Sequence, residues 1–88
     1  MAKSTGETIE RDVPEPAWRQ LAGIIRTRIQ DGRYRPGHAI PSEKQTRAEF
    51  GVSRGTCRKA LAVLRDEGLI YTVPGRGSYV SERPPEGG

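Results

Sequence analysis

The chain of 88 residues has very few of the side chains on which most enzymes and metal sites depend. Cys57 is its only cysteine and His38 its only histidine. A single thiol excludes an intramolecular disulfide and a cysteine-based metal site, and it is typical of a reducing cytoplasm. His38 follows a Pro-Gly turn, and no partner nucleophile or paired carboxylates accompany it. These scarcities predict a protein with no enzymatic activity, no metal and no cofactor.

Long apolar runs are also missing. No stretch approaches the roughly 18 apolar residues that a membrane span needs, and no secretory signal is recognisable. We therefore expect a cytoplasmic location without membrane association. With 33% hydrophobic residues, the chain has enough apolar side chains for one small domain.

Positive charge, in contrast, is abundant and unevenly distributed. Residues 17–81 hold twelve Lys or Arg against five Asp or Glu, a net charge of +7. The two ends together hold three against six, a net charge of −3. A basic body between acidic ends suits a domain that binds a polyanion such as nucleic acid.

The composition divides the chain into three parts. Residues 1–13 predict a flexible arm, residues 14–81 a folded domain, and residues 82–88 a disordered tail. The domain begins with a predicted helix from Ala17 to Asp31, whose apolar residues recur at helical spacing. This spacing places one apolar face of the helix against a core.

Two further helices are predicted around Gly51. Ser42 and Gln45 have the spacing of a capping box at the start of a short helix. Gly51 can adopt the left-handed conformation of a tight corner, and Ser53 can cap a third helix over residues 54–67. Two helices joined in this way form a helix-turn-helix, whose second helix enters the major groove of DNA.

The C-terminal part predicts a β-hairpin. Residues 69–73 and 78–81 favour strands and flank a Pro-Gly-Arg-Gly turn, and Ile40 is expected in a short strand beside them. The predicted fold is therefore α+β and mainly α. It is a winged helix-turn-helix with a three-helix core and a C-terminal hairpin, and we call residues 74–78 the wing.

Several segments, in this order, resemble the DNA-binding domain of the GntR family of bacterial transcription regulators. The resemblance covers residues 14–80 and is carried by Ala17-Trp18-Arg19-Gln20-Leu21-Ala22, Ser42-Glu43-Lys44-Gln45, Phe50-Gly51-Val52-Ser53-Arg54, Gly68-Leu69-Ile70 and Gly75-Arg76-Gly77-Ser78-Tyr79-Val80. It implies a sequence-specific repressor that binds a palindromic site on double-stranded DNA, with a homodimer possible on the DNA.

Candidate DNA contacts lie in two places. Exposed side chains at the start of the third helix are placed for base contacts in the major groove. The resemblance supports these positions and adds a phosphate contact in the preceding helix. The glycine-rich tip of the wing suits a narrow minor groove. The candidates are Lys44, Ser53, Arg54, Gly55, Thr56 and Arg58, and in the wing Gly75, Arg76 and Gly77.

Three positions depart from the family pattern. Members usually carry Leu and then Ala where Thr46 and Arg47 stand, and many have Thr in place of Gly55. We expect the Arg47 guanidinium to reach water, because burying its charge is costly. Gly55 removes one side-chain contact but permits a close approach of the backbone to DNA.

The sequence leaves two questions open. The domain is either a DNA-binding module or a winged helix used for protein interaction, a role in which its basic face would be dispensable. As a regulator, the chain is either a stand-alone protein or the DNA-binding fragment of a longer, ligand-responsive one. Neither a small-molecule effector site nor the lysine-centred signature of an aminotransferase-like partner domain is recognisable.

Overall fold

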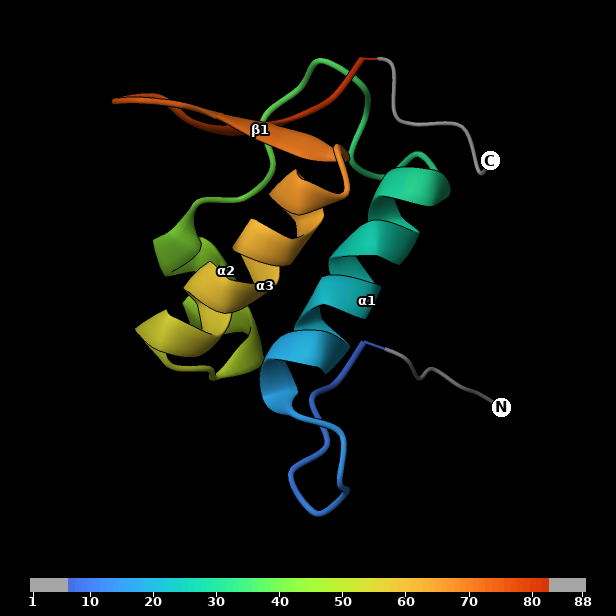
Figure 1. Ribbon diagram of the computed structural model, residues 1–88, viewed down its shortest axis with the longest axis vertical. Coiled ribbons are helices and arrows are strands. Elements are labelled where there is room, and N and C mark those ends of the chain that lie inside the picture. Colours follow the sequence, from blue (N-terminus) through green and yellow to red (C-terminus); the bar gives the residue numbers. More distant parts are fainter. Residues whose placement is uncertain (1–6, 83–88) are drawn as a thin grey trace.

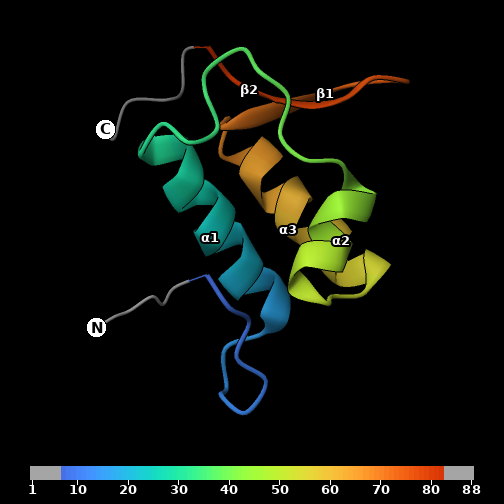
Figure 2. The same cartoon turned by 180° about the vertical axis from the view of Figure 1, so that it is seen from behind.

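The computed structural model describes residues 7–82, which form three helices and a two-stranded antiparallel sheet (Figure 1). In chain order these are α1 (Ala17–Gln30), α2 (Glu43–Phe50), α3 (Arg54–Asp66), β1 (Ile70–Val73) and β2 (Gly77–Val80). Helix α3 lies between α1 and α2, and the sheet crosses one end of the helices (Figures 1 and 2). The predicted architecture of three helices followed by a hairpin is confirmed.

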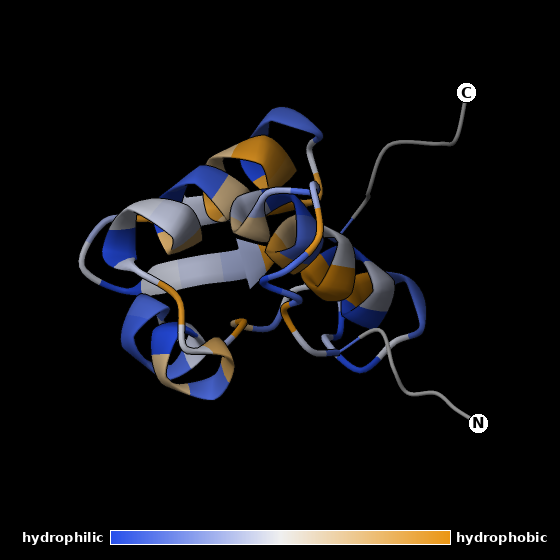
Figure 3. Cartoon of the chain, turned by 90° about the horizontal axis from the view of Figure 1, so that it is seen from below, coloured by the Kyte–Doolittle hydropathy of each residue, from blue (hydrophilic) through white to orange (hydrophobic). Residues whose placement is uncertain are grey.

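The core is built from the apolar faces of the helices and the inner face of the sheet. Leu21, Ile25, Leu64 and Val80 are almost completely buried. The apolar residues gather where the helices face one another (Figure 3). Cys57 is buried among them, and burial raises the pKa of its thiol, so this cysteine acts as a small apolar residue.

The helix-turn-helix forms through short-range hydrogen bonds. The Ser42 hydroxyl accepts the Gln45 N–H at 3.0 Å, and the Gln45 side chain accepts the Ser42 N–H at 2.9 Å, which completes the predicted capping box. Gly51 ends α2 with a φ of 65°, and Val52 is buried. Ser53 then caps α3 by accepting the Thr56 N–H at 3.1 Å. Each contact that shapes the helix-turn-helix therefore joins residues no more than four positions apart.

The two unusual residues of α2 are accommodated without a buried charge. Thr46 is the buried residue of this helix, whereas Arg47 is exposed, as we expected. Helix α2 approaches α3 closely at Cys57, whose sulfur lies 4.0 Å from the carbonyl oxygen of Glu43. Small side chains at Thr46 and Cys57 suit this close approach.

The hairpin pairs Ile70 with Val80 and Tyr71 with Tyr79. Ile70 and Val80 face the core, whereas the two tyrosine rings stack on the outer face with centroids 5.9 Å apart. The loop between α1 and α2 contributes the third segment that was expected beside the hairpin. Ala39 forms a bridge with Tyr79, and the adjacent Ile40 N–H donates to the Ser78 carbonyl at 3.0 Å.

The boundaries shift slightly from those predicted. Helix α3 ends at Asp66, because Glu67 forms its C-cap, and the strands begin at Ile70 and Gly77. The larger correction concerns the flexible arm. Ile9 of this segment is buried in the core, while most of the residues around it stay exposed. An arm was predicted because this segment is polar, but Ile9 inserts into the core and polar residues beside it bond to the helices. Residues 1–6 of that arm and 83–88 of the predicted tail lie outside the described residues.

Further contacts hold this N-terminal segment in place. The Arg11 guanidinium donates to the carbonyl oxygen of Gly51 at 2.7 Å, at the corner of the helix-turn-helix. The Gln20 side chain of α1 accepts the Glu10 N–H at 2.7 Å and donates to the Glu10 carbonyl at 2.9 Å. The segment therefore connects α1 with the end of α2.

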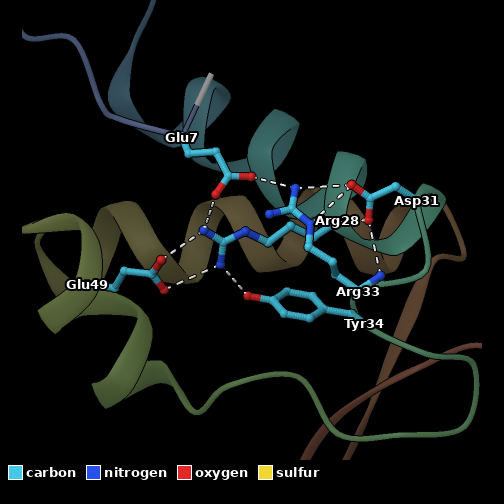
Figure 4. Close-up of polar contacts among 6 residues, drawn as sticks. All are labelled: Glu7, Arg28, Asp31, Arg33, Tyr34 and Glu49. Carbon is cyan, nitrogen blue, oxygen red and sulfur yellow. Dashed lines mark hydrogen bonds and ion pairs between the residues drawn. The ribbon is translucent and has the colours of Figure 1, made fainter. Parts of the chain in front are cut away.

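A buried arginine reinforces this connection (Figure 4). Arg28 of α1 is only 8% exposed. Its guanidinium donates to Glu7 at 2.7 Å, to Glu49 of α2 at 2.8 Å and to the Tyr34 hydroxyl at 2.6 Å. It also lies 5.3 Å from the centre of the Phe50 ring. Arg28 therefore joins three segments that are distant in sequence, a role that no local sequence pattern predicts.

The same cluster predicts a measurable acid sensitivity. Hydrogen bonds from Arg28 and then Arg33 lower the pKa of Glu7 from 4.5 to about 2. A lowered folded-state pKa stabilises the fold fully above the unfolded value and loses that effect as pH falls through the folded value. We expect the thermal midpoint of the wild-type chain to fall between pH 5 and pH 2, and to fall less in Glu7→Gln.

Circular dichroism melts over this pH range measure the difference. The two chains should converge at the acid end, where Glu7 is protonated in both. Because the Glu7 side chain is 37% exposed, solvent screening keeps the effect modest. Parallel curves for the two chains would contradict the assignment.

Candidate nucleic-acid interface

Two arginines dominate the exposed start of α3. Arg54 and Arg58 are one helical turn apart, and their side chains are 65% and 60% exposed. Lys44, near the start of the adjacent helix α2, is also exposed. The start of α3 and the tip of the hairpin project on the same side of the molecule, away from α1 (Figures 1 and 2). This side therefore presents several exposed positive groups.

Glu43 lies between the two arginines. Its Oε1 accepts a hydrogen bond from Nε of Arg58 at 3.2 Å, and its Oε2 lies 3.5 Å from Nε of Arg54. Glu43 is not among the residues predicted from the sequence to contact DNA. The contacts arise because α2 crosses α3, so no local pattern in the sequence indicates them.

The two candidate hydroxyls are bonded to each other. Besides capping α3, the Ser53 hydroxyl donates to the Thr56 hydroxyl oxygen at 3.0 Å. The single proton of Ser53 is therefore in use, while the proton of Thr56 stays free to meet an external acceptor. Of the two, Thr56 is the better candidate donor to a phosphate or a base edge.

The structural reason for glycine differs among the three candidate positions. At Gly75 and Gly77 the φ angles are +78° and +126°, values that L side chains rarely adopt. The Arg76 N–H donates to the Val73 carbonyl at 2.9 Å and closes the turn. Gly55 is helical, and a Cβ added there would meet no atom within 4 Å. The chain itself therefore does not require glycine at position 55, which leaves close approach by a partner as a reason for it.

The structure does not join all the candidates into one cluster. Arg76 is exposed at the tip of the wing, and no hydrogen bond or ion pair within residues 7–82 connects it with the start of α3. The two groups share a side of the molecule but form separate clusters on it. A partner that touches both must span α3 and the hairpin.

One basic residue on this side was missed. Arg65 follows Arg54 and Arg58 by eleven and seven positions, so the three lie along one side of α3. The Arg65 guanidinium donates to the Thr72 hydroxyl of β1 at 3.3 Å. The helical spacing of the three arginines is a signal that was available in the sequence.

Lys59 lies elsewhere. Its ammonium group sits 4.6 Å from the centre of the Trp18 ring of α1. This lysine therefore stabilises the contact between α1 and α3.

Other kinds of site find no support in the described part of the chain. Residues 7–82 contain no group of three or more His, Cys, Asp or Glu side chains placed to hold a metal ion. None of the helices described is long and apolar enough to cross a membrane.

Relatives of this chain share its sequence over most of its length. The family model described as bacterial regulatory proteins, gntR family, matches residues 18–80. An uncharacterized HTH-type transcriptional regulator of Rhizobium meliloti is 42% identical over 77 residues, which cover 88% of this chain and 32% of that protein. The mannosyl-D-glycerate transport/metabolism system repressor of Escherichia coli is 43% identical over 68 residues, which cover 77% of this chain and 28% of that protein. The chain spans about a third of the length of these curated relatives.

Solved structures show the same similarity in three dimensions. The AraR DNA-binding domain in complex with an operator matches with a TM-score of 0.75 at 39% identity, covering 76% of this chain and 81% of that chain. A GntR family transcriptional regulator from Listeria monocytogenes matches with a TM-score of 0.78 at 32% identity, covering 83% of this chain and 64% of that chain.

Proposed function

Because this chain belongs to the gntR family of bacterial regulatory proteins and has the winged-helix fold of its DNA-binding domain, we propose that it binds double-stranded DNA sequence-specifically as the DNA-binding part of a transcriptional regulator. The observation that carries this proposal is the exposed pair of Arg54 and Arg58 at the start of α3. Both side chains are largely exposed, and the start of α3 lies on the side to which the hairpin also projects.

Each candidate residue has a proposed role in the complex. Helix α3 enters the major groove, where Arg54 donates to O6 and N7 of a guanine and Arg58 contacts a second base or a phosphate. Thr56, Ser53 and the backbone at Gly55 lie against the DNA strand. Lys44 contacts a phosphate. The wing, with Gly75, Arg76 and Gly77, enters the minor groove.

The regulatory role is proposed on similarity. Several relatives carry the word repressor in their names, among them the mannosyl-D-glycerate system repressor. We propose that this chain represses transcription in the cytoplasm, without enzymatic activity, from a palindromic operator occupied by two copies.

Selection from a randomised pool of DNA duplexes tests the proposal and yields the operator. Fluorescence anisotropy with the selected duplex, a scrambled duplex and a range of salt concentrations then measures affinity and preference. We expect the selected duplex to bind at least about a thousandfold more tightly than the scrambled one. A pool that yields no preferred sequence would favour the protein-interaction role, to which the stack of the exposed Tyr71 on the half-buried Tyr79 is suited.

Lys44→Ala is expected to weaken binding to all duplexes alike. A lysine that contacts a phosphate carries no sequence information but releases one counterion on binding. The slope of log affinity against log salt should therefore become shallower by about one. Anisotropy titrations of the selected and the scrambled duplex measure both effects. A change in base preference would place Lys44 at a base edge instead.

A further inference from the structure

We propose that Glu43 is a positioning residue for base recognition, and that its carboxylate holds Arg54 and Arg58 in the arrangement in which they read DNA. This inference rests on the proposed function, because it concerns how the same surface distinguishes one sequence from another. It adds to that surface an acidic residue from α2.

The geometry shows how one carboxylate serves both arginines. Each of its oxygens faces the Nε of one of them, at 3.2 Å for Arg58 and 3.5 Å for Arg54. Within residues 7–82, the terminal nitrogens of these two guanidinium groups have no hydrogen-bond partner. The two terminal nitrogens form an edge that can meet O6 and N7 of guanine together. Glu43 therefore restrains each arginine from behind and leaves this edge free.

Restraint matters because both arginines are long and exposed. A free arginine samples many rotamers and loses that freedom on binding. A shared carboxylate limits these rotamers in advance and fixes the separation of the two guanidinium groups. The side chain of Glu43 is itself only 30% exposed, so it is held between the helices.

The same carboxylate acts against the wrong complexes. If both arginines turned away from Glu43 to grip phosphates, the carboxylate would be left unpaired beside a polyanion. Specificity often depends on such a repulsive element as much as on attraction. Glu43 therefore weakens non-specific binding while it supports the specific arrangement.

The test compares Glu43→Gln with Asp66→Asn. Both variants remove one negative charge, but Asp66 lies at the far end of α3 and makes no ion pair within the described residues. We expect Glu43→Gln to bind the scrambled duplex more tightly and to lose about tenfold of its preference for the selected duplex, roughly the value of one good base contact. Asp66→Asn should keep the wild-type preference.

A second variant separates the two effects. Glu43→Asp keeps the charge but is one methylene shorter, so it cannot reach both arginines. It should lose preference without gaining affinity for the scrambled duplex. In the free 88-residue chain, the NMR signal of the Arg58 Nε–H should be protected from exchange in wild type and in Asp66→Asn, and lost in Glu43→Gln.

The outcomes are distinct. Equal duplex preference in Glu43→Gln and Asp66→Asn, or an Arg58 signal that survives Glu43→Gln, overturns the positioning role while the proposed function stands. A wild-type chain that selects no sequence overturns the proposed function and this inference together.

Discussion

Replacing Arg28 with alanine is expected to lower the free energy of unfolding by about 3 kcal/mol, a large share of the stability of so small a domain. The guanidinium is buried and joins Glu7, Glu49 and Tyr34 by hydrogen bonds. Alanine removes these bonds together with the buried stem of the side chain. The expected loss lies at the lower end of the range for a broken buried ion pair. The reason is that both glutamates are partly exposed, so water can solvate them once Arg28 is gone.

Arg33→Ala is the matched control. Arg33 also pairs with Glu7, but half of its side chain is exposed. Its removal should destabilise the fold much less than removal of Arg28, because solvent screens an exposed ion pair. Urea unfolding followed by circular dichroism measures both variants against wild type. Similar losses for Arg28→Ala and Arg33→Ala would show that the cluster acts through net charge rather than through the buried guanidinium.

Replacing Arg54 with alanine should reduce affinity for the selected duplex by roughly 1–3 kcal/mol, about five- to 150-fold. The reason is that a guanine contact made through two hydrogen bonds is lost, whereas binding to phosphates continues. Affinity for a scrambled duplex should therefore fall much less. Selection with the variant from a randomised pool should show one position at which the preference for guanine has relaxed.

Arg35→Ala provides the control for Arg54→Ala. Arg35 is exposed in the loop between α1 and α2 and carries the same charge, but it lies outside the start of α3. Its removal should leave the selected sequence unchanged. If Arg54→Ala and Arg35→Ala weaken both duplexes by equal factors, Arg54 contributes only charge.

Much of the fold could be predicted because its boundaries are local. The capping box of Ser42 and Gln45, the left-handed Gly51 and the cap at Ser53 all act within four residues. Such short contacts can be predicted because they depend only on the residue types at a fixed spacing along the chain. The candidate residues on α3 could be chosen for the same reason, since exposure at the start of a helix follows from periodicity. Their roles on DNA remain predictions.

The sequence by itself determined the three helices, the corner between α2 and α3, the hairpin and the positive charge of the body. Only the tertiary structure decided which charges meet. Glu43 reaches Arg54 and Arg58 across the crossing of two helices, and Arg28 finds Glu7 and Glu49 at a separation of 21 residues on either side. These pairings depend on how the helices and the N-terminal segment pack. Packing is set by the whole core rather than by any short run of residues.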